Sequence, residues 1–551
     1  MLFRSINLFA DYKVDLFGDF AFTGSGGYGL NFGCATCQPQ GNTVLAAVIT
    51  QPQYNGAFNP YQSAPQPGAE GIYGIFVQKA RNQTIDLTAK VDGSLFQLPG
   101  GAVRIAAGYE YTKLDFGFRA LNSLNLTTSA MTSRYAKNHR IIDSVFGELF
   151  VPVVGNDNAL PFVEKLDLSA AVRYDKYSDV GGTTNPKVGV TWRPNGQFLV
   201  RGSWGTSFRA PTLGESDPRT VGQTNRVFVA NGLNNPAIPV TNTATGQSLV
   251  LQRGGNSGGL GPENARIYSW GIDFTPDAIP DFKLGLTYYN VSYKNRIENL
   301  PNATLILSNA TAYDQYKEFF IAAPQPASCV NGGQPGVPGT PQYSTYNPAY
   351  LPFLSDPNAV YSPSSNNDCQ LVGIITGGTR NLGRVLQSGI DLTASYAHET
   401  PIGRAAINAS FSKILNLKRG LLPASTPVDA LDTFGNQASA RGRATASLSK
   451  NGITGNLTAN YVGSYINNAT ITVAGVKYPD TRIPIWMTYD AGLSYRTPEG
   501  DSALAGLRLS VNVQNLTDKD PPIVLSGNNA YDVANANVFG RVWSFEISKK
   551  F

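Results

Sequence analysis

The sequence lacks the features of most soluble proteins and of helical membrane proteins. Only 15% of its 551 residues are charged, against about 25% in an ordinary soluble domain. No unbroken apolar run reaches the roughly 18 residues that a spanning helix needs. If this chain crosses a membrane, it must therefore do so with strands.

Histidine is also scarce, which argues against catalysis. The two histidines, His139 and His398, lie far apart in strand-like segments, and no His/Cys cluster has the spacing of a zinc site. No Gly-x-Ser-x-Gly elbow occurs at a strand-to-helix turn, because no helical stretch is evident. We therefore expect no enzyme, no catalytic residue and no cofactor.

The charge pattern does not indicate a binding partner, and the start of the sequence does not contain a recognisable targeting signal. The 43 basic and 38 acidic side chains are spread along the whole chain and leave a net charge of +5, so we expect no nucleic acid as a partner. The opening segment has Arg4 inside its apolar run and lacks a small-residue cleavage site, unlike a secretory signal. We expect the start of the polypeptide to be missing.

Only four cysteines occur, and they form two candidate pairs in polar, loop-like stretches. A disulfide between Cys329 and Cys369 would restrain a long segment. According to loop-closure theory, this restraint would stabilise the folded protein by roughly 3–4 kcal/mol. For Cys34 and Cys37 we favour a small loop disulfide over a redox pair, because no thioredoxin-like βαβ pattern surrounds them. Both pairs suit an oxidising compartment.

A Gly-x-Gly-x-x-Gly spacing occurs at Gly24, Gly26 and Gly29. A phosphate cradle of this kind requires a following helix within a βαβ unit, and the sequence CATCQPQGN follows instead. We therefore expect no nucleotide site. Residues 24–82 are rich in Gly, Gln, Pro and Asn, which predicts one long loop.

What the sequence does contain is alternation. In residues 453–465, apolar Leu457, Ala459 and Tyr461 alternate with polar Thr458 and Asn460, and a period of two is typical of a strand with one apolar face. No segment shows the continuous apolar run of a sheet buried on both faces. Because spanning strands must pair all their backbone groups, we expect a closed antiparallel transmembrane β-barrel with a polar interior.

Connection lengths support this architecture. Counted back from the C-terminus, long and short connections alternate ten times; the long ones include 209–263 and 299–382, and the short ones include Pro194-Asn195-Gly196, where Asn-Gly favours positive φ. Outer-membrane barrels separate long outer loops from short inner turns in this way. The count predicts about sixteen strands in one barrel domain over residues 1–551, the first running to about Phe22.

The last predicted strand, 538–551, carries Trp543, Phe545 and Phe551 on one face. A terminal aromatic on an alternating strand resembles the signal that the barrel-assembly machinery recognises, so we expect this machinery and outer-membrane lipid as partners. Lys549 interrupts the aromatic face, at a cost of roughly 0–1 kcal/mol near the membrane interface.

Residues 145–213 resemble consecutive strands of the TonB-dependent outer-membrane receptors. The similar stretches are VFGELFVPVV, LDLSAAVRYDKYSDVGGTTNPKVGVTWRP and LVRGSWGTSFRAPTL, with the signature Phe208-Arg209-Ala210-Pro211. SLFQLPGGAVRIAAGYEY before them, and SVNVQNLTDKDPP and GRVWSFEISKKF after them, extend the resemblance over most of residues 93–551. It implies a 22-stranded barrel around an N-terminal plug, in the outer membrane of a Gram-negative bacterium, that takes up a scarce nutrient using the TonB complex.

The sequence departs from this family pattern at its start. About sixteen strands fall short of 22, and no plug or TonB box precedes them. We therefore expect a C-terminal fragment that transports actively only if a plug is supplied, and whose last strand has an unpaired outer edge. The alternatives are a plugless, passive porin-like channel, a surface adhesive barrel, or a soluble sandwich or propeller, although no blade period is visible.

We expect the Phe208-Arg209-Ala210-Pro211 signature to support the base of a loop rather than to bind a ligand. Because loop-base motifs recur across differing substrates, we favour Phe208, Arg209 and Pro211 as rim residues that position the following loop over Arg209 as a ligand group. We expect a nutrient ligand of the siderophore or the carbohydrate class, because the many Asn, Gln and Tyr residues of the loops fit both equally well. Haem is disfavoured, because no Asn-Pro-Asp-Leu box follows the signature and neither histidine lies in a predicted long loop.

Overall fold

The computed structural model describes residues 2–549 except for 17–18, 37–39, 42–72, 124–131, 218–222, 234, 236–237, 241–245, 255–258, 300–305, 308–309, 323–370, 376–377, 421, 423–425, 469–471, 474–475, 478, 499, 501–503 and 526–529. Within these residues the chain is almost entirely strand. No helix among them is long and apolar enough to cross a membrane.

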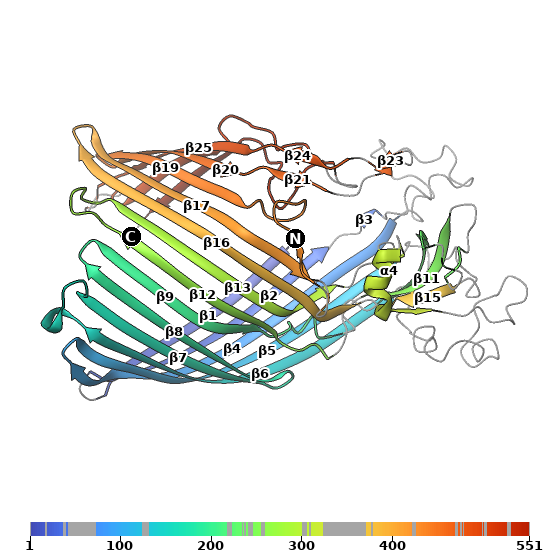
Figure 1. The fold of residues 1–551 in the computed structure, drawn as a ribbon, viewed down its shortest axis with the longest axis horizontal. Helices are drawn as coiled ribbons and strands as arrows, with labels where there is room; N and C mark the ends of the chain where they lie inside the picture. Colours follow the sequence, from blue (N-terminus) through green and yellow to red (C-terminus); the bar gives the residue numbers. More distant parts are fainter. Residues whose placement is uncertain are drawn as a thin grey trace, which may run out of the picture.

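One antiparallel sheet of 19 strands forms a curved wall (Figure 1). Two of its strands, β3 (Gln40–Gly41) and β18 (Val428–Asp429), have only two residues, so seventeen long strands make up the wall. Each long strand pairs with the next one along the chain: β1 (Leu2–Asp15), β2 (Ala21–Thr36), β4 (Tyr73–Leu98), β5 (Gly101–Ser123), β6 (Thr132–Val154), β7 (Lys165–Tyr177), β8 (Gly181–Asn195), β9 (Phe198–Arg209), β12 (Glu263–Phe274), β13 (Lys283–Asn299), β16 (Thr379–Thr400), β17 (Gly403–Gly420), β19 (Ala440–Lys450), β20 (Ile453–Val462), β25 (Trp486–Arg496), β26 (Leu507–Gln514) and β27 (Val542–Lys549).

The predicted antiparallel sheet is confirmed, and the described residues contain seventeen long strands where about sixteen were predicted. The additional strand comes from the opening segment, which we expected to be one strand followed by a loop over 24–82. Instead β1 and β2 form a hairpin, and β2 and β4 continue the wall through much of that predicted loop. Glycine made β2 look like a loop, yet a Cβ on Gly27 would lie 3.2 Å from the ring of Phe9 on β1. The small residue leaves room for an aromatic ring on the neighbouring strand.

The short connections lie at one end of the wall and the long ones at the other (Figure 1). Between β19 and β20, Asn451 and Gly452 have φ values of 50° and 81°, as a two-residue turn with the hairpin twist requires. The positive φ predicted at Asn195-Gly196 is wrong. There the Asn195 side chain accepts hydrogen bonds from the backbone N–H groups of Gln197 (3.0 Å) and Phe198 (3.1 Å) and holds the turn instead.

Two long outer connections fold together rather than remaining unstructured, which corrects the loops predicted over 209–263 and 299–382. They contribute β10 (Gln223–Ala230), β11 (Gln247–Gly254), α4 (Ala310–Tyr316), the 3-10 turn η4 (Lys317–Phe319), β14 (Phe320–Ala322) and β15 (Leu371–Ile375). Strands β11 and β15 pair in parallel and so join the two connections. Val250, Ile306 and Phe319 are buried in the core beneath them, and this cap lies beyond the wall at its long-loop end (Figure 1).

Smaller elements complete the connections. They are the 3-10 turn η3 (Asn156–Asn158) and the two hairpins of β21 (Tyr465–Asn467) with β24 (Thr481–Ile483) and of β22 (Thr472–Val473) with β23 (Val476–Lys477). The connection between β26 and β27 is anchored by Asp532, which is 1% exposed and accepts hydrogen bonds from the backbone N–H of Ala534 (2.9 Å) and the amide of Asn535 (2.9 Å). Asn535 in turn accepts hydrogen bonds from the Ala438 N–H and the Arg441 guanidinium. The connection between β26 and β27 is thereby fixed to the connection between β17 and β19 and to the start of β19.

The two faces of the wall are inverted relative to a soluble sheet. On β7, Leu168 and Val172 are 44% and 48% exposed, whereas Asp167 and Asp175 on the opposite face are 7% and 3% exposed. Apolar side chains that face outward around polar ones that face inward are the pattern of a barrel wall in lipid. On β13 the apolar outward residues end at Tyr288, and polar residues follow towards the long-loop end.

Two connections at the short-turn end of the wall are in direct backbone contact. An added Cβ on Gly100 would lie 2.3 Å from the carbonyl oxygen of Pro152, and one on Gly155 would lie 2.3 Å from the carbonyl oxygen of Gly100. The turn between β4 and β5 therefore packs against the end of β6, with no room for a side chain.

Gly100→Ala is expected to lower the free energy of unfolding by about 1–3 kcal/mol, since backbone atoms cannot move aside as a side chain could. Urea titration of the protein in lipid vesicles measures the change. Gly147→Ala on β6 is the matched control, because a Cβ there meets nothing within 4 Å. Equal stabilities of the two variants would contradict the contact between the turns.

The two ends of the wall are not joined to each other within the residues described here. β1 pairs with β2 and β27 pairs with β26, and no pairing between β1 and β27 is found. All eight residues of β27 are exposed, including Trp543 (56%) and Phe545 (75%).

Candidate functional sites on the inner face of the wall

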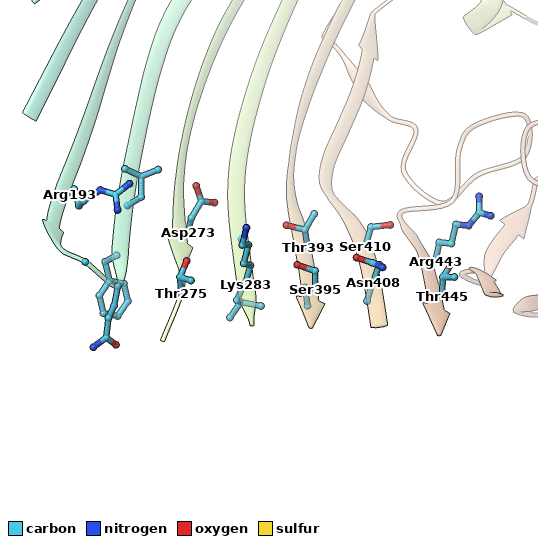
Figure 2. A pocket seen from close by; sticks show the side chains of 18 residues that line it. Arg193, Asp273, Thr275, Lys283, Thr393, Ser395, Asn408, Ser410, Arg443 and Thr445 are labelled. Carbon is cyan, nitrogen blue, oxygen red and sulfur yellow. The ribbon is translucent and has the colours of Figure 1, made fainter. Parts of the chain in front are cut away.

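The inner face carries a lattice of polar side chains near the short turns, most of them serine, threonine or asparagine. Lys283, Ser395, Asn408 and Thr445 pair in one continuous row from β13 to β19. Thr393, Ser410 and Arg443 form the next row, and Figure 2 shows these side chains side by side along the strand ends. They line a hollow of about 610 Å³ that can hydrogen-bond to a solute or to another polypeptide.

A second polar group lies at the opposite end of the wall, around Arg209. Its Nε and Nη2 atoms donate to the two carboxylate oxygens of Glu263, at 2.6 and 2.8 Å. Nη1 donates to Glu215 at 3.1 Å. Glu263 is 2% exposed and also accepts hydrogen bonds from the Tyr293 hydroxyl and from the Ile297 N–H, the latter at 2.6 Å. One guanidinium thus connects β9, β12, β13 and the following loop.

Local sequence and sheet register together build this network. Arg209 is the last residue of β9 and pairs directly with Glu263, the first residue of β12. Thr212 and Glu215 form a reciprocal cap: the Glu215 N–H donates to the Thr212 hydroxyl (3.1 Å) and the Thr212 N–H donates to the Glu215 carboxylate (2.8 Å). The capped turn presents Glu215 to Arg209.

The segment after Arg209 turns inward across the wall. Pro211 and Leu213 are buried, and the Asn138 amide on β6 donates to the Leu213 carbonyl (3.3 Å) and to the Asp217 carboxylate (2.7 Å). Residues 210–217 therefore lie against strands that are remote in sequence, and they form a shelf at the long-loop end of the interior.

The charges of this network are strongly fixed. Burial alone would raise the pKa of Glu263, but hydrogen bonds from Arg209, Tyr293 and Ile297 hold it below its usual range. Burial likewise opposes the lowered pKa of Glu215, which the Thr212 N–H and Arg209 bring about. The hydrogen bond to Glu263 raises the pKa of Arg209, and burial together with Glu263 raises the pKa of Tyr293 to about 12. Glu263 and Glu215 are therefore ionised at neutral pH, and both form ion pairs with Arg209.

Beside the network is a second hollow of about 610 Å³. It is lined by Arg209, Glu215 and Glu263 on one side and by residues of β13, β16 and β17 on the other: Tyr289, Val291, Tyr293, Arg296, Ile297, Val385, Gln387, Leu417 and Arg419. The lining of this outer hollow includes two carboxylates, two tyrosines and several aliphatic side chains. Serine, threonine and asparagine are more frequent in the hollow near the short turns, where they lie together with Arg193, Lys283 and Arg443.

Of the predicted site residues, Trp543 and Phe545 lie on β27, and the others fall into three groups. Phe208, Arg209 and Pro211 lie at the junction of β9 and its loop, and Arg209 contacts the loop residue Glu215. Cys34 lies in β2 and not in the predicted loop. Cys37, Cys329, Cys369 and Phe551 lie outside the described residues, so both disulfides and the role of the terminal aromatic stay predictions.

Sequence reasoning missed Glu215, Glu263, Tyr293, Arg296 and Arg419. One signal was readable, because Thr212-Leu213-Gly214-Glu215 matches the Thr-x-x-Glu capping pattern. For the others no local signal exists, since Arg209 and Glu263 are 54 positions apart and only the register of β9 and β12 brings them together.

Comparison with known proteins supplies a family. The TonB dependent receptor-like β-barrel family model matches residues 4–516. No curated protein matches the sequence.

Solved structures with a similar fold include the outer membrane transporter YddB from Escherichia coli, with a TM-score of 0.58 at 10% identity over 100% of this chain and 63% of that one. The pyoverdine outer membrane receptor FpvA from Pseudomonas aeruginosa PAO1, bound to pyoverdine, gives 0.54 at 11% identity over 99% and 61%. The FpvAI–pyocin S2 complex gives 0.54 at 12% over 98% and 54%. The chain thus spans a little more than half the length of these structures.

Proposed function

The chain belongs to the TonB-dependent receptor-like β-barrel family, and on that premise we propose that it forms the wall and outer loops of a receptor for a scarce nutrient. The receptor lies in the outer membrane of a Gram-negative bacterium, where the barrel-assembly machinery inserts it. The long loops and the cap face the outside, and the short turns face the periplasm.

The observation that carries this proposal is the division of the inner face into two chemically different ends. The outer hollow beneath the loops has the mixed apolar and charged lining of a ligand site. The hollow near the short turns has the many small hydrogen-bonding groups that suit contact with a polypeptide in the interior. A ligand site outside and a polypeptide site below it correspond to the receptor and plug of the family.

Active transport by this receptor depends on a plug in the interior, because the TonB complex acts on the family through the plug. The family match covers residues 4–516, which form most of the wall. We propose that residues 1–551 act together with such a plug and are not competent for active transport alone. The nutrient is of the siderophore or the carbohydrate class.

Growth and uptake in the source bacterium test this function. Transcription of the gene and uptake of the nutrient are expected to rise under iron starvation for a siderophore receptor, or with glycan supply for a carbohydrate receptor. Uptake is expected to stop when TonB is deleted. Unchanged uptake without TonB would instead favour a passive, porin-like channel, and the absence of any uptake under both conditions would favour an adhesive barrel.

A further inference from the structure

Among the described residues, no carboxylate forms an ion pair with the guanidinium of Arg419 in the outer hollow. Arg419 is the second-last residue of β17 and is exposed towards the hollow. Within the described part of the chain its side chain has neither an ion pair nor a hydrogen bond. By contrast, Arg209 is held by two carboxylates and Arg296 is held by Glu298 at 3.0 Å.

The surroundings of Arg419 make the binding of an anion beside it favourable. Burial, followed by the positive charge of Arg296, lowers the pKa of Arg419, and Glu298 opposes this effect only in part. A cation whose pKa is lowered by a like charge gains stability when an anion binds beside it. The two acids that line the hollow do not meet this demand, because Glu263 and Glu215 are engaged by Arg209 and by backbone N–H groups.

The remaining lining groups complement an organic anion. The Gln387 amide donates to the Tyr289 hydroxyl at 3.3 Å, which leaves the hydroxyl proton of Tyr289 available to a ligand. Val291, Val385 and Leu417 supply apolar surface between the charged groups. Carboxylates pair well with guanidinium groups, because two parallel N–H bonds match the two oxygens.

We propose that the outer hollow binds a carboxylate-bearing organic anion, with Arg419 as its principal charge partner, Arg296 as the second, and Tyr289 as a hydrogen-bond donor. This inference rests on the proposed receptor function and narrows the ligand class. An anionic chelator can pair with the positive charges of Arg419 and Arg296, whereas a neutral sugar cannot.

Binding of citrate to the purified chain in detergent tests the proposal by isothermal titration calorimetry, with maltotriose as the neutral probe. Saturable citrate binding is expected for the unchanged protein, and about tenfold or more weaker binding for Arg419→Gln. Arg419→Lys is expected to fall between the two, because a lysine keeps the charge but loses the paired donors. Maltotriose is expected not to bind.

The matched control is Lys418→Gln. Lys418 precedes Arg419 and does not line the hollow, since it points to the opposite face of β17. This variant removes one positive charge from nearly the same place and is expected to bind citrate as the unchanged protein does. A heat-modifiable band of equal strength in all variants shows that they remain folded.

Three results would overturn the anion site. These are no citrate binding by the unchanged protein, undiminished binding by Arg419→Gln, and an equal loss in Lys418→Gln, which would indicate a general charge effect. Binding of maltotriose in place of citrate would refute the ligand class and leave the receptor function standing. Citrate binding that persists while uptake proves independent of TonB would refute the receptor function alone.

Discussion

Replacing Glu263 with alanine is expected to lower the free energy of unfolding by about 3–5 kcal/mol, the range found when one partner of a buried ion pair is removed. The carboxylate is 2% exposed and receives two hydrogen bonds from Arg209, one from Tyr293 and one from the Ile297 N–H. Alanine leaves the Ile297 N–H without its acceptor and leaves Arg209 with Glu215 as its remaining carboxylate partner. Urea titration in lipid vesicles measures the loss.

The control for this variant is Glu399→Gln. Glu399 has a side chain that is 76% exposed and lies 3.9 Å from Arg404, and such exposed pairs contribute about 0–1 kcal/mol. If the free energy of unfolding of Glu263→Ala were no lower than that of Glu399→Gln, the network around Arg209 would not contribute to stability. Limited proteolysis between residues 210 and 262 is expected to increase in Glu263→Ala only.

The same network predicts a pH dependence. Because the folded-state pKa of Glu263 is below its unfolded value of about 4.3, its contribution to stability is fully present above that value. The contribution is lost as the pH falls through the lower, folded-state pKa. Glu263→Gln is expected to be less stable at neutral pH and to show a smaller loss of stability between pH 5 and the acid limit.

Ala170→Lys is expected to lower the free energy of unfolding by about 2–4 kcal/mol, the cost of a lysine on the lipid face near the membrane midplane. Ala170 is exposed on β7 and pairs with Leu149 on one side and Val188 on the other, which are 39% and 47% exposed. A lysine placed there meets only apolar neighbours and lipid. Urea titration in lipid vesicles again provides the measurement.

Ala171→Lys is the matched control, since it makes the same substitution one residue further along the strand. Ala171 pairs with Glu148 and Lys187 on the inner face. Its lysine can reach water and Glu148, so a change below about 1 kcal/mol is expected. A larger loss for Ala171→Lys than for Ala170→Lys would show that the assignment of the two faces is reversed.

Period-two alternation and the parity of connection lengths were sufficient to predict the antiparallel wall. Both are local properties: a strand such as β20 shows its two faces in its own residues, and a tight turn such as Asn451-Gly452 shows itself in its own dihedral preferences. The miss at β2 has an equally local cause. Glycine weakens the strand signal of β2, and the compensating ring of Phe9 is on the neighbouring strand.

The sequence by itself determined the antiparallel wall, the outward apolar face, and the position of the Phe208-Arg209-Ala210-Pro211 signature at the end of a strand. Only the tertiary structure decided what Arg209 binds and that Arg419 has no ion pair among the described residues. Register sets Arg209 opposite Glu263, and the meander sets Arg419 beside Arg296, on strands separated by a long loop and a further strand. Whether an arginine is neutralised depends on which carboxylates lie within hydrogen-bond distance, and that distance has no counterpart in sequence separation.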